Sequence, residues 1–254
     1  MTVTRIPVPH DRVPHGAVNA YVVERGGRAV LVDPPERHPD IDAAVPADLD
    51  AVAVTHHHPD HAGGVAHYAR ETGATVWGRA GRERAFEAAT GVAPDRTFRE
   101  GTDIADTLAV LDTPGHAPEH VGFSTPEGLL GGDLAVAEGS VAVAAPEGDL
   151  RAYLTSLRRV RTRSPDRIYP GHGPVIEDPR ATCERLVRHR LDRERRVLAA
   201  IREGADTLDA VTEAAYEKDV SAVWEMAVAT VAAHVEKLAV EGRVRRDGDR
   251  VRPT

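Results

Sequence analysis

The chain has 254 residues, of which 41% are hydrophobic, so it is long enough to form one sizeable domain and a small second one. Its formal net charge of -8 argues against a general attraction to polyanions. The only cysteine, Cys183, excludes an internal disulfide, residues 1–10 contain no apolar signal segment, and no apolar run approaches the length of a membrane span. These features predict a cytoplasmic protein that does not associate with membranes.

In chain order, the first predicted elements are two antiparallel strands, 17–23 and 28–32, around a turn at residues 25–27. Further strands are predicted from short apolar or β-branched runs at residues 51–54, 108–111, 129–132 and 167–169. Helices are predicted over residues 63–72, 79–89 and 150–162.

The composition changes after Pro179. Residues 180–203 form a charged pattern with spaced apolar positions, which predicts a connecting helix. The next predicted elements are three short helices and a hairpin with an Asp-Gly turn, over residues 208–216, 223–226, 228–241 and 243–251. Helices followed by a hairpin indicate a winged-helix-like domain over 204–254, which the connecting helix joins to a first domain over 1–179.

The most informative motif lies at residues 56–61, where four side chains that can bind metal occupy six positions: His56, His58, Asp60 and His61. No ordinary fold requires this density of imidazole and carboxylate. Because Pro59 disfavours a helix through the cluster, we expect these side chains on a loop after the strand 51–54. Zinc sites use imidazole nitrogen and carboxylate oxygen, and a catalytic ion keeps a position open for water. Four local ligands do not complete two such sites.

Three further turns each present one candidate ligand after a strand-like run. His116 and His172 each follow a Pro-Gly pair, and Asp133 follows two glycines that let the backbone pass close to an ion. His57 is expected to point away from at least one metal, and His120 is expected to be structural, with a role in orienting a ligand as the alternative. The other histidines are interpreted as solvated or locally hydrogen-bonded: His10, His15, His38, His67, His189 and His234.

Taken in order, these motifs resemble the metallo-β-lactamase superfamily over about residues 15–178. The resemblance implies an α/β fold with a four-layer αββα sandwich. It also implies a first metal ion held by His56, His58 and His116, a second held by Asp60, His61 and His172, and Asp133 between the two. The β-lactamases themselves usually lack a carboxylate at the position of Asp133, so hydrolysis of penicillins is disfavoured.

The C-terminal features narrow this resemblance. The segment Tyr-Pro-Gly-His-Gly-Pro at 169–174, the pairs His189-Arg190 and Arg193-Glu194, and the winged-helix-like tail resemble the beta-lactamase-like protein 2 group. That group includes a mitochondrial single-stranded endoribonuclease, and related fungal proteins release polyketides as thioesterases. The resemblance therefore implies hydrolysis of a small ester- or thioester-like substrate, in the manner of a hydroxyacylglutathione hydrolase, or else cleavage of single-stranded RNA. A winged-helix regulator that senses a ligand is a third interpretation.

Both hydrolytic functions use two divalent ions about 3.5 to 4 Å apart, which hold a bridging water and lower its pKa to about 7. Asp60 is the predicted catalytic residue, which orients this water and takes its proton. Two zinc ions are expected, with manganese or iron as alternatives. Aromatic residues make up only 4% of the chain, and the single compact basic patch is the arginine-rich hairpin, so a small molecule ranks ahead of RNA as the partner. A homodimer is compatible with the sequence.

Overall fold

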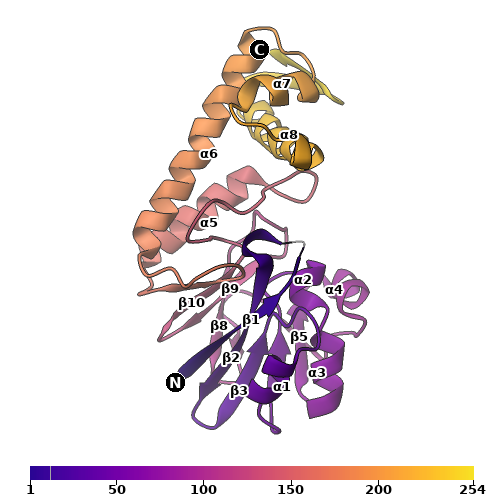
Figure 1. Ribbon diagram of the computed structural model, residues 1–254, viewed down its shortest axis with the longest axis vertical. Helices are drawn as coiled ribbons and strands as arrows, with labels where there is room; N and C mark the ends of the chain where they lie inside the picture. The colour runs from indigo at the N-terminus through magenta and orange to yellow at the C-terminus, as the bar shows by residue number, and fades with distance from the viewer. Residues whose placement is uncertain (12) are drawn as a thin grey trace.

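The computed structural model describes every residue except Arg12. Two β-sheets face each other, helices cover the outer side of each sheet, and a small helical unit lies at one end of the molecule (Figure 1). This is the predicted four-layer α/β sandwich with a C-terminal domain.

The first sheet has six strands in the order β1-β2-β3-β4-β5-β6. Its first three strands pair antiparallel and the later ones parallel: β1 (Thr2–Pro9), β2 (Ala17–Arg25), β3 (Arg28–Val32), β4 (Ala51–Ala53), β5 (Thr75–Arg79) and β6 (Arg96–Phe98). The outer face of this sheet is covered by α1 (Pro39–Ala44), α2 (Pro59–Ala62), α3 (Val65–Thr72) and α4 (Glu83–Thr90).

Alternation along the strands assigns side chains to the two faces of this sheet. Val22 and Leu31 belong to the cluster under the helices, whereas the neighbouring Val23 and Val30 pack toward the second sheet. Both sets are buried because the sheet is covered on both sides.

The second sheet has five strands in the order β11-β10-β9-β8-β7. β10 and β11 are parallel and the other pairs antiparallel: β7 (Asp103–Ile104), β8 (Leu108–Asp112), β9 (Val121–Thr125), β10 (Gly128–Gly132) and β11 (Ile168–Pro170). Its outer face packs against α5 (Leu150–Arg163) and the first half of α6 (Pro179–Arg202).

The C-terminal unit packs on the second half of α6. It consists of α7 (Leu208–Ala215), a 3-10 turn η2 (Ser221–Val223), α8 (Trp224–Val240) and the hairpin β12 (Val244–Asp247) and β13 (Arg250–Pro253). Val197 and Ile201 of α6 share a buried cluster with these elements, whereas Cys183 and Leu186 belong to the cluster of the second sheet. The helix predicted as a connector therefore contributes to two cores. No helix among the described residues combines the length and apolar character needed to cross a membrane.

Three predictions about individual elements were wrong. Arg79 ends strand β5 instead of starting a helix, and α4 begins only at Glu83, after Gly81 at φ 80°. The helices predicted over 223–226 and 228–241 are one continuous helix, α8, because no glycine or proline interrupts it. Asp60 and His61 were expected on a loop but lie in the one-turn helix α2, which begins at Pro59. Proline suits the first helical position because the N–H that it lacks would have no partner within the helix.

Candidate metal centre

The predicted ligands all lie at one edge of the sandwich, where several strands end. His56 and His58 follow β4, and Asp60 and His61 occupy the first turn of α2. The loops after β8, β10 and β11 carry the other three candidates, which are His116, Asp133 and His172. The structure groups candidate ligand atoms within 4.8 Å of one another in three sets: His56, His58 and His116; His56, His61 and Asp133; Asp60, His61 and His172.

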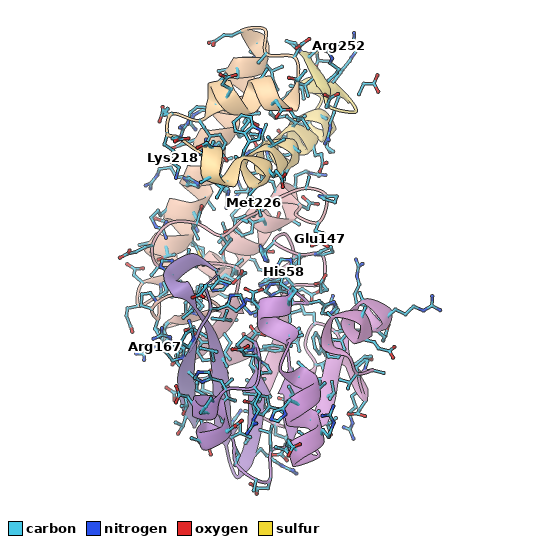
Figure 2. All side chains as sticks on the ribbon, turned by 45° about the vertical axis from the view of Figure 1, so that its right-hand side comes forward. His58, Glu147, Arg167, Lys218, Met226 and Arg252 are labelled. Atoms are coloured by element: carbon cyan, nitrogen blue, oxygen red, sulfur yellow. The ribbon has the colours of Figure 1, made fainter. Side chains whose placement is uncertain are left out.

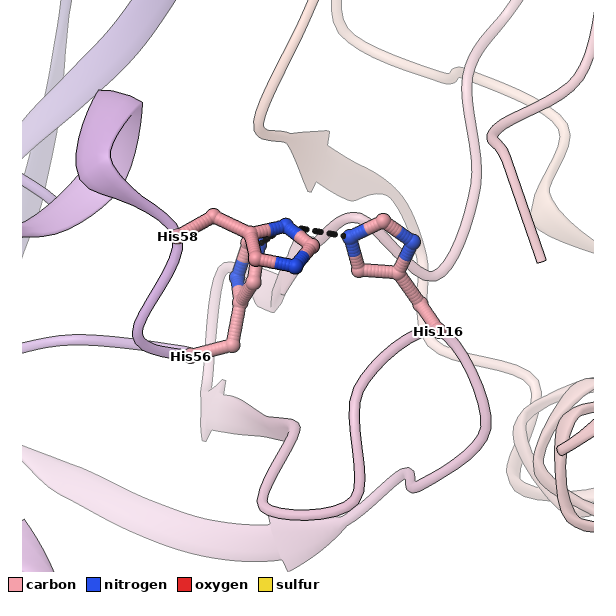
Figure 3. Close-up of side chains that lie close together, drawn as sticks. All are labelled: His56, His58 and His116. Carbon is pink, nitrogen blue, oxygen red and sulfur yellow. Dashed lines mark hydrogen bonds between the residues drawn. The ribbon is translucent and has the colours of Figure 1, made fainter. Parts of the chain in front are cut away.

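In the first set, three imidazole nitrogens converge (Figure 3). The Nδ1 atom of His58 lies 3.0 Å from Nε2 of His56 and 2.9 Å from Nε2 of His116. The other ring nitrogen of each residue has an acceptor outside the set: the hydroxyl of Thr55 at 3.1 Å, Glu147 at 3.4 Å and the Ala142 carbonyl at 2.7 Å, for His56, His58 and His116 respectively. Protons held on the outer side leave the converging nitrogens with lone pairs.

A second set of nitrogen and oxygen atoms comes together from Asp60, His61 and His172. The Nε2 atoms of His61 and His172 are 3.4 Å apart, and Oδ2 of Asp60 is 3.5 Å from the latter. His61 donates its Nδ1–H to Asp33 at 3.0 Å, and His172 donates its Nδ1–H to the Ala17 carbonyl at 3.0 Å. These outer hydrogen bonds favour the tautomers whose facing nitrogens have lone pairs, and a cation between the two rings removes the repulsion of those lone pairs.

Asp133 lies between the two sets. Its Oδ2 atom is 3.5 Å from Nε2 of His116, and its Oδ1 atom is 3.4 Å from Nε2 of His172 and 3.6 Å from Nε2 of His61. Oδ1 is buried without a hydrogen-bond donor among the described residues. A buried carboxylate oxygen without a donor is costly. The position of Asp133 therefore suits an oxygen ligand shared by two cations.

The electrostatics of the cluster keep the carboxyl of Asp133 ionised, which favours a positive charge next to it. Burial opposes ionisation of Asp133, but the imidazoles of His61, His172 and His116 hold the pKa of its carboxyl far below the usual range. Burial likewise opposes protonation of His61, yet Asp33 and Asp133 raise its pKa to about 9. The pKa of His56 is well below its ordinary value because of burial and the neighbouring imidazoles. The donor set thus pairs imidazoles with carboxylates, the combination that divalent metals prefer in proteins.

Glycine allows the close approach of two of these loops. A Cβ on Gly171 would lie 2.5 Å from Oδ1 of Asp133 and 2.6 Å from Cε1 of His61. Any side chain at residue 171 would therefore displace candidate ligands. The sequence interpretation gave this role to the glycines before Asp133, and a Cβ on Gly132 would collide with Oγ1 of Thr55.

Asp33 is an important site residue that the sequence interpretation missed. It is 1% exposed and accepts hydrogen bonds from the backbone N–H and hydroxyl of Thr55, at 2.6 and 2.7 Å, as well as from His61. The available signal was its place directly after β3, beside the end of the parallel strand β4. Asn19 was also missed, and it holds the loop on both sides of His172 by donating to the Pro170 and Gly173 carbonyls.

The structure also places the remaining histidines. His57 points away from the cluster, toward Glu119 and the ring of Phe86, as expected. His120 accepts a hydrogen bond from the backbone N–H of Asp133 at 3.1 Å, a contact with a candidate ligand that fits the alternative of a ligand-orienting role, and burial lowers its pKa to about 3. The interpretation of His234 was wrong, because it is 1% exposed and neither ring nitrogen has a hydrogen-bond partner among the described residues.

A cleft of about 1200 Å³ opens over the candidate ligands. Its walls combine apolar side chains of the loop 133–142 and of the N-terminal region with Met226 from α8. His10 and His15 also line it, together with Asp11 and Glu138. Among its described lining residues there is no arginine or lysine.

Comparison of the chain with protein-family models agrees with the fold and with the cluster of histidines and carboxylates. Residues 13–172 match the model of the metallo-beta-lactamase superfamily, and residues 207–252 match that of the beta-lactamase associated winged helix domain. The chain belongs to the metallo-beta-lactamase superfamily and also contains the associated winged helix domain. It is therefore a member of a hydrolase family with a candidate metal site.

Individual relatives extend this result. A beta-lactamase-like protein 2 homolog from Drosophila melanogaster is 30% identical over 250 residues, which cover 89% of this chain and 84% of the relative. A hydroxyacylglutathione hydrolase from Methylobacillus flagellatus is 33% identical over 155 residues, 60% of each chain. The crystal structure of a metallo-beta-lactamase family protein from Thermus thermophilus matches with a TM-score of 0.79 and 26% identity, over 99% of this chain and 98% of that one.

Proposed function

We propose that this protein is a dinuclear metal hydrolase that acts on acyl thioesters or related esters. The observation that carries the choice of substrate is the cleft over the candidate ligands. Its described walls combine apolar side chains with carboxylates and imidazoles and include no arginine or lysine, which suits an acyl group better than a polyanion. The likeness to a hydroxyacylglutathione hydrolase supports the same class of reaction.

We assign two metal positions to the two groups of converging donor atoms. His56, His58 and His116 would hold the first ion, and Asp60, His61 and His172 the second, with Asp133 shared through its two oxygens. Zinc is the proposed metal because it accepts this mixture of imidazole and carboxylate, with manganese and iron as alternatives. When bound, two such ions activate a water molecule and polarise the carbonyl that it attacks.

Asp60 is the proposed proton acceptor. Its side chain is 20% exposed, it lines the cleft, and its Oδ2 atom faces the imidazoles of His61 and His172. In hydrolysis, the water oxygen forms a bond to the acyl carbon and the carbon–sulfur bond breaks. The Asp60 carboxylate would take the proton of the attacking water and return it to the leaving thiolate, so that a carboxylic acid and a thiol are released.

Cleavage of RNA is less favoured by the placement of the basic side chains. The arginines of the terminal hairpin line a separate hollow, and Figure 2 shows Arg252 at the far end of the molecule from His58. Arg246 and Arg250 are also ion-paired, with Glu236 and Asp206. Single-strand binding relies on a basic groove with aromatic platforms, and the described walls of the cleft provide neither. A purely ligand-sensing regulator would have no use for two adjacent metal positions.

A substrate panel tests the proposal. The protein, loaded in turn with zinc, manganese and iron, would be incubated with neutral N-acetylcysteamine thioesters and with end-labelled single-stranded RNA. We expect thioester hydrolysis at two bound ions per chain, and a loss of at least roughly 100-fold in kcat for Asp60→Ala. Cleavage of RNA that Asp60→Ala abolishes, without thioester turnover, would reverse the choice of substrate.

A further inference from the structure

The C-terminal unit contributes directly to the cleft over the metal centre. Met226 of α8 lines this cleft together with His58, His116 and Asp133, and it is 51% exposed. Figure 2 shows Met226 on the side of the C-terminal unit that faces His58 and Glu147. Val223, just before α8, is another large apolar side chain at this end of the helix and is 57% exposed.

Several contacts hold α8 and the cleft wall together. The backbone N–H of Ala145 donates to the Ala229 carbonyl at 3.0 Å, which joins the loop 133–149 to α8. Arg190 of α6 donates to the Val141 carbonyl of the same loop. The loop in turn orients the metal centre, because the Ala142 carbonyl accepts from His116 and Glu147 lies 3.4 Å from Nε2 of His58. The backbone of α8 at Met226 therefore has a defined position relative to the reacting centre.

Apolar side chains from both units line the cleft. Val136, Val141 and Ala142 come from the loop 133–149, and Met226 comes from the C-terminal unit. A flexible thioether side chain suits the binding of apolar groups of different shapes. The volume of about 1200 Å³ exceeds what an acetyl or lactoyl group needs, so the distal part of the cleft is available for a longer chain.

We propose that Met226 is a specificity-determining residue which contacts the distal part of an apolar acyl chain, so that the preferred substrates are thioesters of medium or long acyl chains. This inference rests on the proposed function for the reaction itself. It adds that the C-terminal unit completes the substrate site. Each methylene that loses an apolar contact reduces kcat/KM by roughly fourfold.

The kinetic test compares octanoyl and acetyl thioesters of N-acetylcysteamine. For Met226→Asp, the ratio of kcat/KM for octanoyl over acetyl should fall by roughly tenfold or more, as expected when about two methylenes lose their contact. Met226→Leu should retain most of the ratio. Val240→Asp is the matched control, because Val240 is on the same helix, is 65% exposed and does not line the cleft. An unchanged ratio in Met226→Asp would overturn the inference while leaving the proposed reaction intact.

A chemical footprint tests the same contact without turnover. The only native cysteine, Cys183, is buried, so Met226→Cys and Val240→Cys each introduce one exposed thiol. A non-hydrolysable octanoyl thioether analogue should slow alkylation at residue 226 by roughly fivefold or more, leave residue 240 unaffected, and act more strongly than the acetyl analogue. Protection without thioester hydrolysis would retain the apolar subsite and reject the proposed reaction. Equal labelling with and without the analogue would reject the subsite.

Discussion

At the scale of single residues, the candidate metal centre depends on which ring nitrogen of each imidazole carries the proton. Every candidate ligand histidine has an acceptor near its outer nitrogen, and the acceptors are drawn from different loops. Asp33 influences two of these histidines. It accepts a hydrogen bond from His61 directly, and it is linked to His56 through the hydroxyl of Thr55. One carboxylate thus sets the orientation of two candidate ligands.

Asp33→Asn should therefore weaken metal binding without removing a ligand. An amide can donate to His61, which favours the tautomer whose Nε2 carries the proton. We expect a loss of about 10- to 100-fold in metal affinity, measured by competition with a chelator. Asp95→Asn is the control, because Asp95 also accepts a backbone hydrogen bond at a strand, from Val76, but lies outside the cluster. Equal affinity in the two variants would contradict the role of Asp33.

His234 makes the stability of the protein sensitive to acid. Burial, together with Arg190, Arg193 and His189 of α6 and Lys237 of α8, lowers its pKa well below the ordinary value of 6.5, while the nearby Glu194 is ion-paired with Lys237. Below pH 6.5, His234 therefore binds a proton in the unfolded chain but not in the folded chain. The free energy of unfolding falls as the pH falls. Above pH 6.5 neither state binds this proton, and the loss of stability is absent.

His234→Leu should remove this dependence. In EDTA, where metal release plays no part, the free energy of unfolding of the variant should improve relative to the parent by about 1 to 2 kcal/mol between about pH 8 and pH 5. Urea titrations at the two values measure this difference. If the two proteins lose stability in parallel, His234 is not the responsible group.

At the scale of elements, the loop 133–142 is held in place from outside by helix α6. The guanidinium of Arg185 donates to the Val136, Ala137 and Gly139 carbonyls, at distances of 2.6 to 2.9 Å. These carbonyls belong to the segment that forms one wall of the cleft. The loop thus has little regular structure of its own and takes its shape from α6.

Arg185→Met should loosen this wall. Loss of the charged donor leaves three carbonyls to water, so we expect the free energy of unfolding to fall by about 1 to 2 kcal/mol and KM to rise more than kcat falls. Arg188→Met is the matched control, because Arg188 lies on the same helix and is exposed. An identical effect of both substitutions would show that the hydrogen bonds to the loop are unimportant.

The sequence predicted the candidate site residues that have a recognisable local pattern around them. Each of His56, His116, Asp133 and His172 follows a strand-like run, and glycine or proline stands close by, so this pattern alone was enough to assign them to loops. Asp33 also follows a strand, but its partners His61 and Thr55 come from later in the chain, and only the parallel pairing of β3 with β4 brings them together. Met226 gave no signal, because one methionine in an apolar helix is normally a core residue.

At the scale of the whole molecule, α6 joins two buried clusters, so they are expected to unfold together. The chain has two tryptophans, and they report on different parts: Trp77 lies in β5 between the sheets, and Trp224 starts α8, where its indole donates to Asp209. Trp77→Phe and Trp224→Phe variants therefore each leave one local fluorescence reporter.

Both reporters should show the same Tm, and chelation should lower both equally. Metal that binds only the folded state stabilises it by about 2.7 kcal/mol at roughly one hundred times Kd, and this contribution is lost in EDTA. Thermal melts of the two variants with and without EDTA test this expectation. A shift confined to Trp77 would mean that the C-terminal unit unfolds independently.

The 24 residues of α6 form a single uninterrupted helix between the sandwich and the terminal unit. Deleting one residue between its two buried halves would rotate one end against the other by about 100° and shorten the separation by about 1.5 Å. Such a change would turn Met226 away from the candidate metal ligands and would break the hydrogen bond between Ala145 and Ala229. If Met226 contacts the substrate as proposed, the number of residues in α6 contributes to substrate choice together with the groups inside the cleft.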